Sequence, residues 1–356
     1  MIKILHGGDF HLDSAFSSLT PEAASQRRCE QRLVLEQLSR LCQDRDLIVL
    51  SGDLFDSARI YRDTLDALHS FFSSVKGEIF IAPGNHDYLA EGSPYLTEVW
   101  GENVHIFTSP VIEKVHIQHL NCDVYGAAFV SPEMPALLDS FQVEDPEAIN
   151  LMVLHGDLQP NSPYNPILSE KVTASGLDYL ALGHIHAMSV QKFGRTTCAY
   201  PGCLMGRGFD ECGEKGILQV SLSKSSCQTD FIPLSVRKYE ILTVEAGEDP
   251  LSAILTALPE DARNDCYRIL LTGEADAPDL SLLEQQLKGR FFSLSLRDHT
   301  VPKTRLWERA GEDTLRGHFL KNLKEQYDLA DEPQRRKIAM AAKLVTALMD
   351  GREVSL

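Results

Sequence analysis

Five short polar segments, each placed after an apolar strand-like run, constrain this chain more than any other feature. In chain order they are Asp9-Phe10-His11, Gly52-Asp53, Gly84-Asn85-His86-Asp87, His155-Gly156 and Gly183-His184-Ile185-His186. Aspartate, asparagine and histidine supply the oxygen and nitrogen ligands of divalent metals. Ligand sites of sheet-based α/β folds form beyond the carboxyl ends of the strands, so the five polar segments predict one site at a sheet edge. The pattern indicates two metals side by side, and so hydrolysis of a phosphate ester.

Spacing within the polar segments suits such a site. Asp9 and His11 are two residues apart, as are His184 and His186, so extended backbone would point both side chains of each pair the same way. An aspartate shared between two cations, here Asp53, would hold them roughly 3.5–4 Å apart, the spacing of two-metal hydrolases. The cations would polarise the phosphoryl oxygen, activate a water and orient an in-line attack.

His86 is the candidate for delivering a proton to the leaving oxygen. It lies between Asn85, an expected ligand, and Asp87. The Asp87 carboxylate can accept a hydrogen bond from the imidazole and so set its orientation and tautomer. We therefore expect His86 and Asp87 to be the catalytic residues beside the metals.

Strands and helices are expected to alternate along residues 1–235. The expected strands are 2–5, 47–50, 79–82, 111–117, 122–127, 149–154, 179–182, 196–200 and 216–221, and the helices 21–44 and 62–74. These strands are too many for one doubly wound sheet. The prediction is an α/β fold in which two facing sheets have helices outside both, a four-layer α-β-β-α sandwich. A β-α-β-α-β order over 236–302 predicts a small second domain, and helices at 304–326 and 333–349 a helical segment over 303–356.

Composition limits the metals and the location. The 356 residues are 43% hydrophobic and 24% charged, so the chain can bury a sizeable core. Its 8 cysteines form no CxxC pair and are interpreted as reduced thiols, which leaves carboxylate, imidazole and amide as ligands. This donor set suits manganese, magnesium, iron or zinc. With no signal peptide and no apolar run of about 20 residues, we expect a cytoplasmic protein without a membrane segment.

Charge is distributed unevenly along the chain. The net charge of −17 argues against a surface coated for nucleic-acid binding. Residues 288–352, however, hold about 14 Lys and Arg against about 9 Asp and Glu. This basic stretch is either a solvated helical face or a docking surface for DNA or a partner protein.

The five polar segments, in this order, resemble the motifs of the calcineurin-type metallophosphoesterases over roughly residues 1–235. Longer matches resemble the SbcD nucleases and their YhaO-like relatives: SGDLFD at 51–56, GNHDY at 84–88, LGHIH at 182–186, YPG at 200–202, GRGF at 206–209 and GEKG at 213–216. The resemblance implies a DNA repair exonuclease, with a capping domain at 236–302. It also implies C-terminal helices that dock on an SbcC/Rad50-like ATPase subunit, and a homodimer.

The same resemblance implies roles for individual residues. The first metal would be held by Asp9, His11, Asp53 and His186, and the second by Asp53, Asn85, His155 and His184. His86 would be the catalytic histidine. Some family members have another histidine where this chain has Asp56, so a second catalytic histidine is not expected.

Four nearby side chains have less specific interpretations. Asp13 and Asp56 are expected to orient ligands or cap helices. His6 in the first strand is expected to be a core histidine or a neighbour of a ligand. Arg207 either contacts a substrate phosphate or forms an ordinary salt bridge.

We expect a manganese-dependent DNA phosphodiesterase, an exonuclease on DNA ends that works with a separate ATPase. One alternative is an enzyme of the same fold acting on a small phosphodiester. Another is a DNA-end-binding scaffold with a vestigial site, which the acidic charge favours and the intact ligand set disfavours. A phosphoprotein phosphatase is disfavoured, because Gly-Asn-His-Asp replaces the Gly-Asn-His-Glu typical of that branch.

Overall fold

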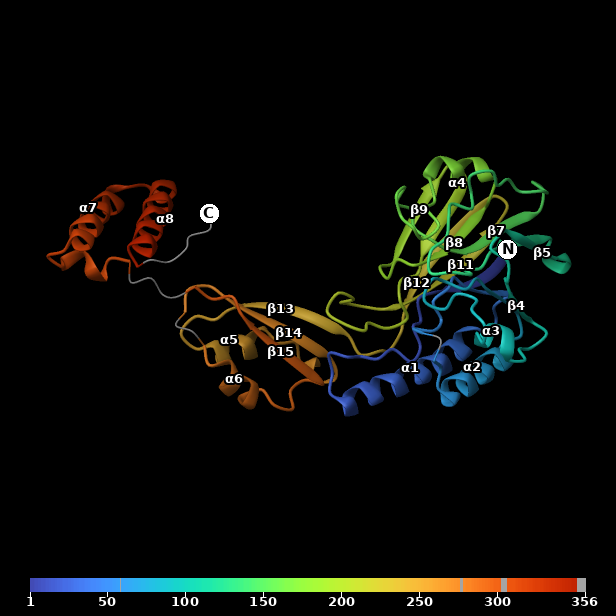
Figure 1. The fold of residues 1–356 in the computed structure, drawn as a ribbon, viewed down its shortest axis with the longest axis horizontal. Helices are drawn as coiled ribbons and strands as arrows, with labels where there is room; N and C mark the ends of the chain where they lie inside the picture. The colour runs from blue at the N-terminus through green and yellow to red at the C-terminus, as the bar shows by residue number, and fades with distance from the viewer. Residues whose placement is uncertain (58, 276–277, 302–305, 351–356) are drawn as a thin grey trace. The chain divides into compact units, whose positions relative to one another are not determined.

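The computed structural model describes residues 1–57, 59–275, 278–301 and 306–350 (Figure 1). The chain divides into two compact units, Met1–Glu240 with Asn264–Cys266, and Ile241–Arg263 with Tyr267–Leu356. All five polar segments lie in the first unit. Among the described residues, no helix has the length and apolar character needed to cross a membrane.

Two six-stranded sheets form the first unit. The first has the order β12 (Ser226–Pro233), β11 (Gly216–Ser223), β1 (Ile2–Gly7), β2 (Leu47–Leu50), β3 (Glu78–Ile81) and β4 (Val104–Ile106). The second has the order β5 (Glu113–Ile117), β6 (Cys122–Gly126), β7 (Ile149–His155), β8 (Tyr179–Gly183), β10 (Thr196–Tyr200) and β9 (Ser189–Phe193). Strands β1 to β4 are parallel, as are β6, β7, β8 and β10. The outer strands β11, β12, β5 and β9 pair antiparallel.

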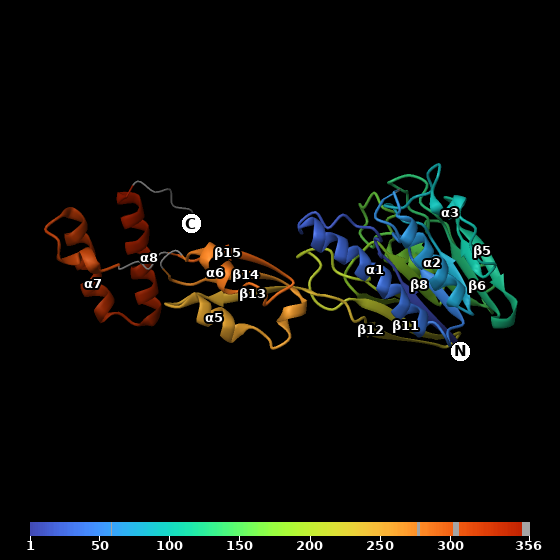
Figure 2. The same ribbon diagram turned by 90° about the horizontal axis from the view of Figure 1, so that it is seen from below.

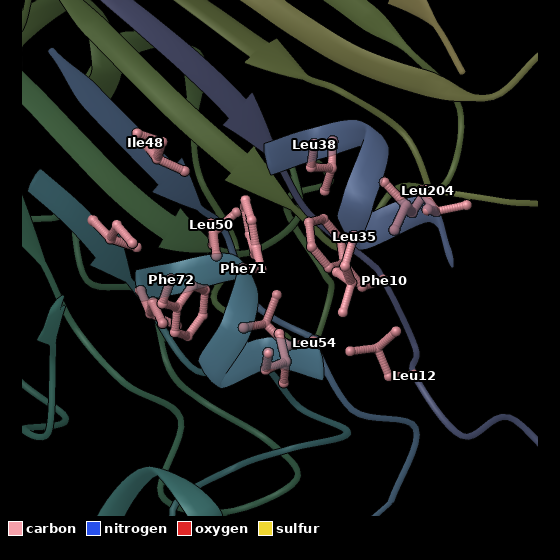
Figure 3. Close-up of a cluster of buried hydrophobic side chains, with 14 of the residues drawn as sticks. Phe10, Leu12, Leu35, Leu38, Ile48, Leu50, Leu54, Phe71, Phe72 and Leu204 are labelled. Carbon is pink, nitrogen blue, oxygen red and sulfur yellow. The ribbon is translucent and has the colours of Figure 1, made fainter. Parts of the chain in front are cut away.

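Each sheet buries apolar side chains on both faces, because successive residues of a strand point to opposite sides. On β2, Leu47 packs between the sheets with Val153 of β7. Its neighbour Ile48 faces outward, in a cluster that includes Leu38 and Phe71 (Figure 3).

Helices cover the outer faces of both sheets. They are α1 (Pro21–Leu41), α2 (Arg62–Ser74), α3 (Pro94–Thr97) and α4 (Ser169–Ser175). Helices α1 and α2 lie side by side over the first sheet (Figure 2), while α4 packs in the outer core of the second. The observed order is therefore α-β-β-α, which confirms the four-layer sandwich.

Three strands, β4, β9 and β12, lie outside the expected set. Each is the last strand at an edge of its sheet, and its residues are mostly half-buried or exposed. Edge strands that face solvent lack the continuous apolar run by which the buried strand β2 was recognised.

The second unit contains a three-stranded sheet and a helix pair. In chain order its elements are β13 (Tyr239–Glu245), α5 (Pro250–Ala257), β14 (Cys266–Thr272), α6 (Leu280–Gln286), β15 (Ser293–Asp298), α7 (Leu315–Leu329) and α8 (Glu332–Met349). The helix expected from 304 begins at Leu315, where the Thr314 hydroxyl oxygen accepts the Gly317 N–H at 3.0 Å. Residues 304 and 305 lie outside the described residues. The division at 235 and 302 stays a prediction.

Candidate metal centre

The five polar segments meet at one edge of the sandwich, beyond the carboxyl ends of β1, β2, β3, β7 and β8. Among the described residues, three groups have ligand atoms within 4.8 Å of one another: Asp9-His11-His186, His11-Asp53-His86 and Asp9-Asp53-His155. Asn85 joins them through Oδ1, which lies 2.8 Å from His155 Nε2 and 3.3 Å from His184 Nδ1. All seven expected ligands are therefore brought together.

The backbone at the ligands is left-handed and not extended, which corrects one expectation. Asp9, His11, Asp53 and His184 have φ angles of 52°, 45°, 52° and 103°. Such angles are uncommon outside glycine and persist only where the surrounding structure holds them. Here the Asp9 N–H donates to the Gly52 carbonyl at 3.0 Å, and the His11 N–H to the Asp53 carbonyl at 2.9 Å.

Two glycines allow the polar segments to approach one another. A Cβ at Gly183 would lie 2.0 Å from the Ser51 carbonyl oxygen, and one at Gly84 would lie 2.2 Å from Asp53 Oδ1. A side chain at either position would therefore push the ligand-bearing loops apart.

In the Asp9-His11-His186 group, both histidines turn a nitrogen lone pair toward the same point, as binding of a cation requires. His11 Nδ1 lies 3.2 Å from Asp56 Oδ1, and His186 Nδ1 lies 2.7 Å from Glu211 Oε1. A neutral imidazole has one N–H, and these contacts place it on Nδ1 in both rings. Both Nε2 atoms then present lone pairs, although they face each other at 3.1 Å. A cation, for which Asp9 supplies a carboxylate, would bind both lone pairs.

The other expected metal position, which includes His155 and Asn85, is arranged in a similar way, but the partner of the histidine is a neutral carbonyl. His155 Nδ1–H donates to the Ser51 carbonyl at 2.9 Å, so its Nε2 lone pair faces Asn85 Oδ1, another acceptor. Asp53 lies between the two groups, because its Oδ2 is 3.4 Å from His155 Nε2 and 3.7 Å from His11 Nε2. The donor set thus fits two divalent cations that share Asp53.

Burial sets the protonation of these groups. It lowers the pKa of His11 and of His184 to about 4, so both imidazoles are neutral at pH 7. It raises the pKa of Asp9 to about 8. Burial also acts to raise the pKa of Asp53, but the neighbouring His155 and His11 hold it below its ordinary value. Neutral imidazoles beside a carboxyl that resists ionisation form a site that a cation would stabilise.

Asp87 supports the site from inside the protein. Among the described residues, its carboxylate does not form the predicted hydrogen bond to the His86 ring. Its carboxylate accepts the N–H groups of Gly84 and Leu54, both at 2.7 Å, and the Tyr95 hydroxyl at 2.5 Å. These donors come from the loops after β2 and β3 and from α3. Asp87 therefore joins the two loops that carry ligands.

His86 presents its ring to solvent directly beside the ligands. Its backbone N–H donates to Asp53 Oδ1 at 2.9 Å, and its exposed ring lies 4.8 Å from the His11 ring, edge to face. This position suits a proton donor and also a further metal ligand.

Three side chains support the site in ways that the sequence either did not indicate or left open: Glu211, Arg207 and His6. Glu211, which holds His186, lies between two recognised motifs and carries no sequence signal of its own. Arg207 donates to Asp56 at 2.9 Å and to Glu211 at 2.8 Å, which favours the salt-bridge interpretation. His6 Nε2 lies 3.1 Å from Ser51 Oγ, so it neighbours a residue that supports a ligand, as expected.

Asp13 caps a helix, as expected from the sequence. Its carboxylate accepts the Tyr61 N–H at 2.8 Å and the Thr64 hydroxyl at 2.6 Å, at the start of α2.

Comparison with known proteins shows which family and which relatives this chain resembles. The calcineurin-like phosphoesterase family matches residues 2–188, more than half of the chain. The chain is 27% identical over 300 residues to the uncharacterized metallophosphoesterase YhaO of Bacillus subtilis (strain 168), covering 77% of this chain and 72% of that protein. It is also 27% identical over 261 residues to SbcD, a component of nuclease SbcCD of the same organism, covering 60% of this chain and 64% of SbcD.

A solved structure also aligns, at lower identity. It is a conserved uncharacterized protein of Streptococcus pneumoniae TIGR4, which aligns over 65% of this chain and 89% of its own, with 15% identity and a TM-score of 0.34.

Proposed function

The chain belongs to the calcineurin-like phosphoesterase family, and from this premise we propose that it is a manganese-dependent DNA phosphodiesterase, an exonuclease on DNA ends. Family membership makes metal-dependent hydrolysis of a phosphoester the general reaction. All seven expected ligands converge, and their imidazole lone pairs point at shared positions. This observation supports a working site over a vestigial one. Similarity to SbcD of nuclease SbcCD supports DNA as the substrate.

The residues of the site divide the chemistry between them. One cation would be held by Asp9, His11, Asp53 and His186, and the other by Asp53, Asn85, His155 and His184. When bound, the cations supply Lewis acidity to the scissile phosphate and lower the pKa of a water. His86, which is exposed beside Asp53, would protonate the departing oxygen.

We also propose that the protein forms a homodimer and works with an SbcC/Rad50-like ATPase subunit. One relative is by its name a subunit of a larger nuclease. Helices α7 and α8 expose large apolar side chains: Leu315 82%, Leu329 90%, Met340 58% and Leu348 63%. Exposed apolar side chains on a helix pair are typical of a surface that docks on a partner. A cytoplasmic location stays part of this proposal.

A second candidate function is hydrolysis of a small phosphodiester. The observation that favours it is the net charge of −17, because a strongly acidic protein gains little from the electrostatic attraction that dominates DNA affinity. The same metal site would serve both substrates.

The test combines purified protein, manganese, labelled linear single- and double-stranded DNA, and a chromogenic phosphodiester. We expect wild-type protein to degrade DNA, and His86→Ala to lose about 10²–10⁴-fold in rate while it still binds manganese. His119→Ala, at an exposed histidine outside the site, is the matched control and should leave the rate unchanged.

Each other outcome selects an alternative. Turnover of the small ester alone, even with a partner ATPase present, would favour the second candidate. Manganese binding without turnover of either substrate would favour a vestigial site.

A further inference from the structure

We propose that Arg207 is a positioning residue that locks the two histidines of one metal position by bridging the carboxylates that hold them. The histidines are His11 and His186, and the carboxylates are Asp56 and Glu211. This inference deepens the proposed function, because it rests on the two-metal site of that proposal. It does not depend on which phosphodiester is cleaved.

The Arg207 guanidinium forks between the two carboxylates. Nη1 donates to Asp56 Oδ1 at 2.9 Å, and Nη2 donates to Glu211 Oε1 at 2.8 Å. A third bond runs from Nε to Glu211 Oε1 at 3.2 Å, and the backbone N–H of Arg207 donates to Glu211 Oε2 at 2.8 Å. Hydrogen bonds between an ionised guanidinium and a carboxylate in this fixed geometry are strong and directional. Glu211 is only 6% exposed, so water competes little for its carboxylate.

Each carboxylate continues the network to one imidazole. Asp56 accepts from His11 Nδ1 at 3.2 Å, and Glu211 accepts from His186 Nδ1 at 2.7 Å. The two Nε2 atoms then meet at 3.1 Å, which closes a ring of five residues around one metal position. Neither imidazole can turn without breaking a bond to an ionised partner.

Two contacts compete for Nδ1 of His186. Arg207 Nη2 lies 3.2 Å from His186 Nδ1, and both atoms carry hydrogens when Nδ1 donates to Glu211. The shorter distance, 2.7 Å, assigns the Nδ1 hydrogen to Glu211. The guanidinium therefore orients His186 through Glu211.

The loop that carries Arg207 is anchored independently of any metal. The fully buried Arg27 of α1 donates from Nη2 to the Gly206 carbonyl at 2.8 Å. The rings of Phe16 and Tyr239 lie 5.4 Å and 5.7 Å from its guanidinium carbon. This packing fixes the backbone next to Arg207, so the fork is in place before a cation binds.

The other metal position lacks such a network. His155 Nδ1 donates to a neutral carbonyl, that of Ser51, and His184 Nδ1 faces Asn85 Oδ1. Among the described residues, no carboxylate accepts a hydrogen bond from either ring. Loss of Arg207 should therefore weaken one metal position and spare the other.

Manganese titration in the absence of substrate tests this asymmetry, with free Mn²⁺ followed by electron paramagnetic resonance. We expect two sites in the wild-type protein. Arg207→Met should weaken one of them about 10–100-fold and leave the second unchanged, as loss of a partner that orients a metal-binding histidine does elsewhere. Arg207→Lys keeps the charge without the fork and should recover part of the loss.

Two further variants make the result decisive. Glu211→Gln keeps the shape of the side chain and should weaken the same position, which also covers the case in which Arg207→Met does not fold. Arg195→Ala, which removes an ion pair with Asp178 outside the site, should leave both affinities unchanged. Circular dichroism of each metal-free variant establishes that it is folded.

Four outcomes would overturn the proposal: equal weakening of both positions, no weakening, the same loss in Arg195→Ala, or fewer than two sites in the wild-type protein. A raised KM for DNA with unchanged manganese affinity would instead make Arg207 a substrate contact. Asymmetric metal loss in a protein that cleaves no DNA would uphold the inference and reject the nuclease assignment.

Discussion

The candidate metal centre and the space between the sheets are built from the same strands, yet they bury opposite kinds of side chain. Between the sheets, β7 places Leu151 and Val153 in an apolar core. At its end, the same strand buries His155, beside Asp9 and Asp53. Apolar burial contributes about 25 cal/mol per Å² to folding, whereas buried ionisable groups cost free energy unless they are paired.

The apolar core and the candidate site therefore occupy separate parts of the same strands. Four of the expected ligand residues also adopt left-handed backbone, which is strained for side chains other than glycine. Substitutions at the candidate metal centre should therefore change activity more than stability, and substitutions between the sheets should do the reverse. Four predictions test that separation.

The largest effect is expected at Asp53, which lies between the two ligand groups. Asp53→Asn should lower phosphodiester turnover by at least about 10³-fold, because bound metals supply several kcal/mol of transition-state stabilisation. The amide keeps an oxygen that can accept the His86 N–H, so thermal unfolding in EDTA should change little. Turnover assays and calorimetry measure both effects. A large loss of stability with little loss of activity would remove the distinction between the two regions.

The reverse is expected for Leu151→Ala, on the same strand as His155 but between the sheets. Leu151 is fully buried, and truncation of such a side chain costs about 2–5 kcal/mol. Urea unfolding of the metal-free protein measures the loss. Manganese affinity of the folded variant should match that of the wild-type protein. A matching fall in affinity would show that the interior and the candidate metal centre are coupled.

A third effect is the pH dependence of metal binding. Burial raises the pKa of Asp9 to about 8, so below pH 8 the metal-free site holds a proton that a cation must displace. His11 and His184, with pKa values lowered to about 4 by burial, stay neutral there. Manganese affinity should therefore fall up to about tenfold for each pH unit between 8 and 6, and level off above 8. Calorimetry at several pH values tests this, and a flat profile would contradict it.

The smallest effect is expected at Tyr95, whose hydroxyl donates to Asp87. Tyr95→Phe removes one of several donors to that carboxylate and should cost about 1–2 kcal/mol of stability. Chemical denaturation measures it, and Tyr61→Phe, at an exposed tyrosine, is the control. If the folded Tyr95→Phe protein also lost turnover, Asp87 would have a direct role in catalysis.

Much of the fold follows from local patterns. The run Leu47–Leu50 is apolar throughout and forms β2 with the expected bounds, because a strand buried on both faces needs apolar side chains at every position. The edge strand β9 has no such run and was not expected. The helix expected from 304 begins only at Leu315, because the cap at Thr314 decides its start.

The residues that come together at the candidate site were predictable, but the contacts that hold them were not. Asp87 was expected to hold His86, and it binds backbone N–H groups instead. Glu211 lies in no recognised motif, yet it holds His186 at 2.7 Å. Hydrogen bonds of this kind depend on where distant parts of the chain come together, which no spacing along the sequence encodes.

The kinds of candidate ligand and their places at the ends of strands can be recognised from the amino-acid sequence alone. Donor chemistry belongs to each side chain, and apolar runs mark the strands, so both can be recognised locally. The tertiary structure decides which ring nitrogen is free in His11, His155 and His186, and which carboxylate or carbonyl binds the other nitrogen. That decision depends on atoms contributed by segments as far apart as Ser51 and His155, or Asp56 and Arg207, which only the packing of the two sheets brings within hydrogen-bonding distance.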